Sequence, residues 1–165
     1  MSNRIYNALF ICTGNSARSI LAEALLNHLG RGRFRAYSAG SHPKGAVHPL
    51  ALETLQEQHV NVSGLSSKSW DVFGTADAPK MDFIFTVCDN AAGEMCPLWP
   101  GQPATAHWGF ADPAAVEGDY ATRKAAFAKT FAEVSQRLQQ FLQLPFDTLD
   151  HASLQQRLQA MGEQQ

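Results

Sequence analysis

The sequence has few cysteines, little net charge and no long hydrophobic run, and each of these shortages excludes a class of protein. Three cysteines with no Cys-x-x-Cys pair argue against a disulfide scaffold and against a zinc site of Cys/His spacing, and favour free or redox-active thiols. A net charge of −2 gives no electrostatic case for nucleic acid as a partner. The apolar stretch before Cys12 is too short for a signal peptide or a membrane span. We therefore expect a cytoplasmic protein with no membrane partner.

What the 165 residues do contain is an alternation of strand and helix patterns. Hydrophobic residues make up 45% of the chain, which is enough for an ordinary core without disulfide bonds or a structural metal. Strands are predicted at 8–11, 34–40, 81–87 and 104–108, and helices at 18–29, 49–59, 70–73, 120–142 and 147–161. This alternation predicts a single doubly wound α/β domain over residues 1–165, with about four parallel strands flanked by helices. Residues 145–165 are expected to form a C-terminal helical tail without chemistry of its own.

The segment CTGNSARS joins the first predicted strand to the first predicted helix. Gly14 and Asn15 tolerate the backbone angles needed to wrap N–H groups around an anion, and the helix adds its N-terminal dipole. Such a loop lowers the pKa of a cysteine thiol, and Arg18 offers a planar fork for two oxygens of an oxyanion. The pattern predicts Cys12 as a nucleophile in an anion-binding loop. The alternative is a buried apolar Cys12 and a surface Arg18.

Asp112 precedes a proline in a predicted loop after the last strand. Asp-Pro is a common turn pair, and taken alone the turn is the better interpretation. Chemistry at the cysteine loop, however, requires a group that protonates a departing oxygen, and a carboxyl group can do this. Beside Cys12 and Arg18, Asp112 is therefore the leading candidate for the general acid.

Cys88 and Cys96 follow the third predicted strand. Because sites in open α/β sheets form outside the carboxyl ends of strands, Cys88 could share a site with Cys12. A thiol relay would use Cys88 to attack an oxidised Cys12, and Cys96 to carry the disulfide outward. The alternative is a buried thiol at the strand end and an incidental thiol in a loop.

The string CTGNSARS resembles the active-site loop of the low-molecular-weight tyrosine phosphatases and of the arsenate reductases built on the same fold. Two further segments, Thr86-Val87-Cys88…Cys96-Pro97 and His107–Pro113, resemble the thioredoxin-coupled arsenate reductase branch. The phosphatase branch typically has a proline where this chain has Ile20 and an aromatic residue where it has Ala114. The resemblance covers roughly residues 5–142.

The resemblance implies that the protein reduces arsenate to arsenite for detoxification. Arg18 would grip arsenate, Cys12 would attack the arsenic, and Asp112 would protonate the leaving oxygen. Cys88 would then attack Cys12, Cys96 would attack Cys88, and thioredoxin would reduce the resulting disulfide. Ser19 would donate a hydrogen bond to the thiolate, and Asn15 would fix the loop. The implied substrate-binding residues, where phosphate or sulfate would compete, are Thr13, Gly14, Asn15, Ser16, Ala17, Arg18 and Ser19.

Other assignments stay open on the sequence. Seven residues separate Cys88 from Cys96, whereas the best-known members of the family have six, so glutathione with glutaredoxin is an alternative donor. No tightly bound cofactor is expected, although some family members bind potassium, and Asn15, Glu23 and Ser38 match residues used there. A phosphatase would need only Cys12, Arg18 and Asp112. A non-enzymatic thiol sensor or oxyanion-binding module would leave Asp112 without a role.

Overall fold

The computed structural model describes residues 5–75, 77–87, 103–146 and 148–163. Four parallel strands form one sheet in the order β2-β1-β3-β4. The predicted doubly wound α/β fold is confirmed. The strands are β1 (Tyr6–Ile11), β2 (Phe34–Ala39), β3 (Phe83–Thr86) and β4 (Ala104–His107).

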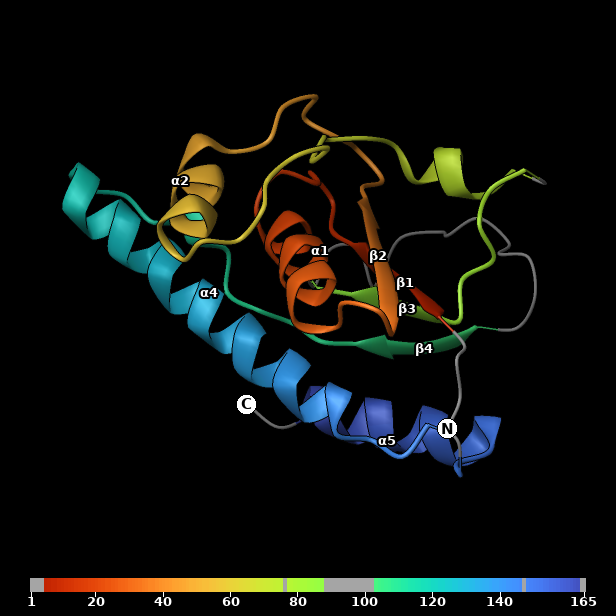
Figure 1. The fold of residues 1–165 in the computed structure, drawn as a ribbon. Helices are drawn as coiled ribbons and strands as arrows, with labels where there is room; N and C mark the ends of the chain where they lie inside the picture. Colours follow the sequence, from red (N-terminus) through yellow and green to blue (C-terminus); the bar gives the residue numbers. More distant parts are fainter. Residues whose placement is uncertain (1–4, 76, 88–102, 147, 164–165) are drawn as a thin grey trace.

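The helices cover the sheet unevenly. In Figure 1, α1, α2 and α4 gather on one side of the sheet, and α5 runs along β4. The α-helices are α1 (Arg18–Leu29), α2 (Pro49–Glu57), α4 (Tyr120–Leu142) and α5 (His151–Glu163), and two short 3-10 helices are η1 (Trp70–Phe73) and η2 (Pro113–Ala115). Among these helices none combines the length and hydropathy that crossing a membrane requires.

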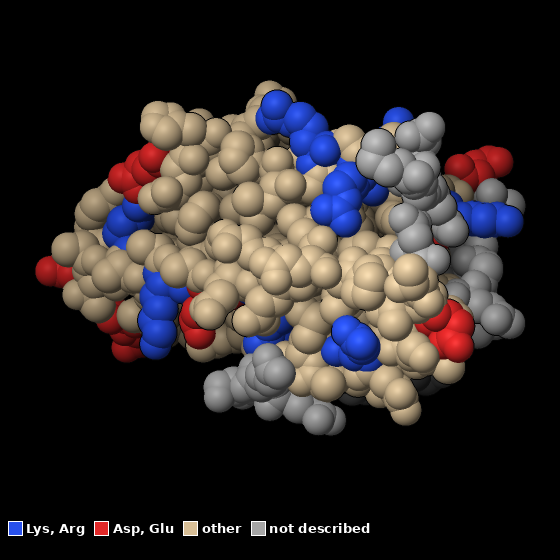
Figure 2. All heavy atoms as spheres, turned by 60° about the horizontal axis from the view of Figure 1, so that its bottom comes forward, with Lys and Arg blue, Asp and Glu red and all other residues tan. Residues whose placement is uncertain are grey.

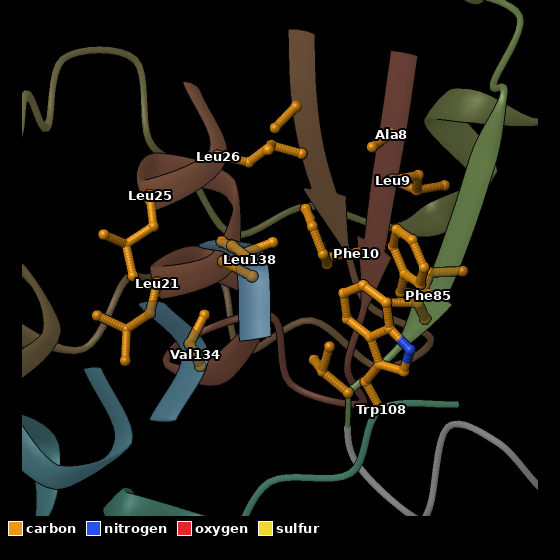
Figure 3. Close-up of a cluster of buried hydrophobic side chains, with 14 of the residues drawn as sticks. Ala8, Leu9, Phe10, Leu21, Leu25, Leu26, Phe85, Trp108, Val134 and Leu138 are labelled. Carbon is orange, nitrogen blue, oxygen red and sulfur yellow. The ribbon is translucent and has the colours of Figure 1, made fainter. Parts of the chain in front are cut away.

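The core lies between the sheet and the helices α1 and α4. Figure 3 shows Leu21 and Leu25 of α1 and Leu138 of α4 on the side of the sheet where Phe10 of β1 projects. The ring of Phe85 stacks on the indole of Trp108, with 3.9 Å between ring centroids. Burying these large side chains contributes about 1.5–3 kcal/mol each. The core therefore fixes the strands whose carboxyl ends carry the site.

Several element boundaries differ from those predicted, and side-chain hydrogen bonds accompany two of these differences. β3 begins at Phe83 because the Asp82 carboxylate, instead of the ladder, accepts the N–H of Asn7 at 2.8 Å. The last helix begins at His151, where the Asp150 side chain accepts the N–H of Ser153 at 2.7 Å. Side-chain oxygens thus set both boundaries. Three residues expected in the core are only half-buried, namely Leu29, Leu52 and Phe131.

The strand order places the loop after β1 at a junction. β1 lies between β2 and β3, so the chain leaves β1 toward one neighbour while β3 lies on the other side. In open α/β sheets the crevice at such a point is where ligands bind. The predicted Cys12 loop therefore begins at the position where this fold provides a site.

Candidate active site

The loop of residues 12–17 joins β1 to α1, and Cys12, its first residue, is buried with 4% of its surface exposed. Segment 41–48 lines the outside of this loop. His42, Lys44 and His48 donate their backbone N–H groups to the carbonyls of residues 13, 14 and 16, at 2.9, 3.0 and 2.9 Å. In a trans peptide the N–H points opposite to the carbonyl. Because these carbonyls face outward, the N–H groups that follow them face the inside of the loop.

The N-terminus of α1 closes the loop. Ala17 occupies the N-cap position and makes no side-chain cap hydrogen bond, and the first turn carries no acidic residue. The first N–H groups of a helix need partners and favour an anion. The end of α1 is therefore built to accept a negatively charged ligand.

A buried polar network lies under the loop. Asn15 adopts a left-handed conformation with φ of 45°, and its side-chain amide donates to the hydroxyls of Ser19 at 2.8 Å and Ser38 at 3.0 Å. Its carbonyl oxygen accepts the backbone N–H of Lys68 at 2.8 Å. Ser38 in turn donates to the Glu23 carboxylate at 2.5 Å. The structure thus brings together Asn15, Glu23 and Ser38, which the sequence singled out.

Arg18 lies at the start of α1 and reaches the loop that follows β4. One terminal nitrogen, Nη1, donates to the carbonyl of Phe110 at 3.1 Å, and Nη2 lies 3.5 Å from Oδ2 of Asp112. Its Nε–H is buried and has no hydrogen-bond partner within the described residues. A buried donor without a partner is costly, and an oxyanion would satisfy it.

Asp112 is a turn residue that also lies beside Arg18, and its role as general acid stays a prediction. Its Oδ1 accepts the N–H of Ala114 at 3.0 Å and caps η2, as a turn residue does. Its other oxygen faces Arg18, and 37% of its side chain is exposed. The turn therefore holds the carboxyl group beside the cysteine loop.

These groups surround a pocket of about 180 Å³. Two of its residues, His42 and Lys44, were not singled out in the sequence. Both follow the carboxyl end of β2, so the rule that sites form at this edge of the sheet was the available signal. The pocket is lined by Cys12, Thr13, Gly14, Ser16, Ala17, Arg18, His42, Lys44 and Asp112.

Cys88 and Cys96 lie outside the described residues. Val87, the last described residue before Cys88, donates its N–H to the carbonyl of Ile11 at 2.9 Å. Ile11 is the residue before Cys12. The strands β1 and β3, which lead to Cys12 and to Cys88, therefore end side by side.

Comparisons with known proteins agree with this geometry. Residues 7–160 match the model of the low molecular weight phosphotyrosine protein phosphatase family. An arsenate reductase of Shouchella clausii is 35% identical over 132 residues, which cover 80% of this chain and 91% of the relative. One of Bacillus subtilis is 33% identical over 141 residues, covering 86% and 96%.

Solved structures of arsenate reductases share the fold. One, described as an arsenate reductase in the phosphate binding state, has a TM-score of 0.68 at 25% identity, covering 84% of this chain and 97% of that one. A thioredoxin-dependent arsenate reductase of Corynebacterium glutamicum has a TM-score of 0.59 at 25% identity, covering 86% of this chain and 64% of that one. The family match and these relatives show that the chain belongs to the low molecular weight phosphotyrosine protein phosphatase family.

Proposed function

We propose that the protein is an arsenate reductase that converts arsenate to arsenite with electrons from thioredoxin. The observation that carries the proposal is the buried Arg18 Nε–H, which has no hydrogen-bond partner in the described residues and lies in the same pocket as a buried cysteine and the N-terminus of α1. These donors suit a tetrahedral oxyanion. The relatives at 33–35% identity are arsenate reductases, which favours arsenate over a phosphate ester.

The first step follows from the pocket. Arsenate would lie against the N–H groups of residues 13–18, with Arg18 on two of its oxygens. The helix N-terminus and the loop amides stabilise negative charge, so they favour the thiolate of Cys12 as nucleophile. Ser19 accepts a hydrogen bond from Asn15, so its own O–H is left to donate toward the thiolate. Asp112 would protonate the oxygen that leaves arsenic as water.

The second part of the proposal is a thiol relay. The Cys88 thiolate would attack the sulfur of the Cys12–arsenic adduct, forming a Cys12–Cys88 disulfide while the electron pair of the S–As bond reduces arsenic to arsenite. Cys96 would then attack Cys88 and release the Cys12 thiolate. A dithiol protein such as thioredoxin would reduce the Cys88–Cys96 disulfide. The neighbouring ends of β1 and β3 support the first exchange.

The donor is proposed as thioredoxin because one of the similar structures is a thioredoxin-dependent arsenate reductase. Glutathione with glutaredoxin is the alternative donor. Either donor works where thiols are kept reduced, so we propose the cytoplasm as the site of action.

Arsenate-dependent NADPH consumption with thioredoxin and thioredoxin reductase tests the proposal. We expect many turnovers in the wild type. Cys88→Ser should stall at the arsenic adduct without releasing arsenite, and Cys96→Ser should stall after about one arsenite per protein, since each variant breaks one exchange. Both variants should still be stabilised by phosphate in a thermal melt, which shows an intact loop. Replacing thioredoxin by glutathione and glutaredoxin identifies the donor. Efficient hydrolysis of an aryl phosphate by all three proteins, with no arsenate turnover, would instead make this protein a phosphatase.

A further inference from the structure

The buried polar network of Asn15, Glu23 and Ser38 under the loop offers few free oxygens to a metal ion. The resemblance suggests potassium at Asn15, Glu23 and Ser38, but Asn15 Oδ1 accepts the N–H of Lys68 and Ser38 Oγ is used as donor and acceptor. Hard cations take six or more oxygen ligands in protein sites. In the described part of the chain no group of three His, Cys, Asp or Glu residues is placed to hold a metal. The residues present do not fit potassium.

The cluster instead contains a cation of its own. The Lys68 ammonium lies 3.9 Å from Oε1 of Glu23 and donates to the carbonyl of Ser66 at 2.6 Å. The side chains of Lys68 and Glu23 are 22% and 12% exposed, so water screens the pair only partly. A second cation at Glu23 would be repelled by this ammonium.

We propose that the Lys68 ammonium is the permanent cation beneath the oxyanion loop and positions that loop, so that the protein works without potassium. Lys68 reaches the loop twice. Its backbone N–H holds the side-chain carbonyl of Asn15, and its ammonium neutralises Glu23, which accepts the hydrogen bond of Ser38. Asn15 and Ser38 are hydrogen-bonded to each other. The charge on Lys68 is therefore connected to the left-handed residue that shapes the loop.

The charge also acts on the protonation state of Glu23. Burial raises the pKa of the Glu23 carboxyl group, and the Ser38 hydroxyl and the Lys68 ammonium oppose this rise. Removal of the ammonium would leave a buried carboxylate without its counter-charge, which is destabilising at neutral pH. Protonated Glu23 needs no counter-charge. The effect of removing Lys68 should therefore shrink as the pH falls.

A first experiment uses the wild-type protein. Thermal melts and binding of inorganic phosphate are measured in KCl and in NaCl at equal ionic strength. We expect the same Tm and the same Kd for phosphate in both salts. A higher Tm and tighter phosphate binding in KCl alone would overturn the inference.

A second experiment compares Lys68→Met with Lys129→Met, a control on the exposed face of α4. We expect Lys68→Met to weaken phosphate binding about fivefold to tenfold. Its loss of Tm should be larger at about pH 7.5 than at about pH 5, and adding Glu23→Gln should restore most of both properties. A purely structural lysine would show neither the pH dependence nor the rescue. Equal behaviour of the two Met variants would also overturn the inference.

If Lys68→Met does not fold, Lys68→Arg replaces it. This variant keeps the positive charge, so it should bind phosphate as the wild type does in both salts. Loss of phosphate binding in Lys68→Arg would contradict the proposal that the charge positions the loop. The inference deepens the proposed function, yet its measurements use phosphate and need no arsenate turnover. A protein that shows the expected salt and pH behaviour without reducing arsenate would refute the proposed function alone.

Discussion

At the residue scale, Gly40 shows how an absent side chain shapes the site. A Cβ at Gly40 would lie 2.5 Å from the carbonyl oxygen of Thr13 and 2.7 Å from that of Cys12. Both contacts are to backbone, which cannot move without displacing the loop. We expect Gly40→Ala to lower kcat/KM for arsenate about 100-fold, because catalytic geometry tolerates little displacement. Steady-state kinetics check this expectation.

Gly32→Ala is the matched control for that variant. Gly32 has a φ of +84° and open space where a Cβ would be, between α1 and β2. The substitution strains the backbone by about 1–2 kcal/mol. It should lower Tm and leave the arsenate kinetics unchanged. If Gly40→Ala also lowers Tm but leaves the arsenate kinetics unchanged, the geometry of the loop does not depend on the close approach of Gly40 to the carbonyls of Cys12 and Thr13.

Lys44 adds a positive charge at the rim of the pocket. Its side-chain carbons lie over Gly14, where a Cβ would be 3.2 Å from Cε, and its backbone N–H bonds the Gly14 carbonyl. Lys44 is exposed, so its attraction for an anion is modest and screened by salt. We expect Lys44→Met to raise KM for arsenate about threefold to fivefold at low salt, with kcat unchanged.

Lys80→Met, which removes an exposed charge outside the pocket lining, provides the comparison. The Lys44→Met effect should fade at high ionic strength, and that of Lys80→Met should be absent throughout. An unchanged KM in Lys44→Met at low salt contradicts an electrostatic role for Lys44.

The candidate site was predictable from sequence where its residues lie in one loop. Cys12, Arg18 and the Gly14-Asn15 turn lie within seven residues of one another, so their spacing could predict an anion-binding loop. His42, Lys44 and Lys68 reach the loop only through tertiary contacts, and isolated basic residues carry no local signal. The predicted relay residues Cys88 and Cys96 remain predictions, because they lie outside the described residues.

At the element scale, α5 supports the end of β4. Trp108 follows β4, and its indole N–H donates to the carbonyl of Leu158 at 2.9 Å in a buried position. The Gln155 side chain exchanges two hydrogen bonds with the backbone of Thr105, at 2.8 and 2.6 Å. These contacts cover an edge strand whose backbone groups would otherwise invite another chain.

Trp108→Phe tests how strongly this packing stabilises the protein. The variant keeps an aromatic ring beside Phe85 but removes the buried hydrogen bond from the indole N–H to the Leu158 carbonyl. A hydrogen bond of this kind contributes about 0.5–1.5 kcal/mol net. We expect urea denaturation to show a loss of this size with an unchanged slope. No loss of stability would mean that the indole hydrogen bond does not contribute to holding α5 against the sheet.

Most elements were predictable because their periodicity is strong. Residues 120–142 were predicted as a helix, and α4 has the same bounds, since Phe127, Val134, Leu138 and Phe141 recur at helical spacing and are buried. The boundaries of β3 and α5 were missed because Asp82 and Asp150 bond to neighbouring backbone. Periodicity carries no information about such side-chain bonds.

At the scale of the whole molecule, charge is dispersed on one face and concentrated at the pocket. Figure 2 shows Lys, Arg, Asp and Glu scattered in small groups among uncharged residues on the face it presents. At the pocket, by contrast, Arg18 and Lys44 carry positive charge toward one cavity, and among the described residues that line it Asp112 is the single carboxylate. This arrangement attracts a small anion locally and needs no large field.

The stability of the whole molecule should depend on pH through His48, which joins the loop to α2 and α4. Its ring nitrogen Nδ1 accepts the backbone N–H of Leu50 at 3.1 Å, and its ring packs on Phe127 with 4.7 Å between ring centroids. The backbone N–H of His48 donates to the Ser16 carbonyl. Burial, with Arg123 and Lys44, lowers the pKa of His48, against an opposing effect of Asp112. Only the neutral ring can accept the Leu50 N–H.

Because the pKa of His48 is lowered, its contribution to the free energy of unfolding is present above pH 6.5. This contribution is lost as the pH falls from that value through the lowered pKa. Glu23 acts in the opposite direction, because its raised pKa removes stability as the pH rises above 4.5. The His48→Asn variant isolates the histidine, since Asn caps a helix at any pH. We expect Tm to fall less between about pH 7.5 and about pH 5.5 in this variant than in the wild type. Parallel curves for the two proteins would show that protonation of His48 does not govern their acid sensitivity.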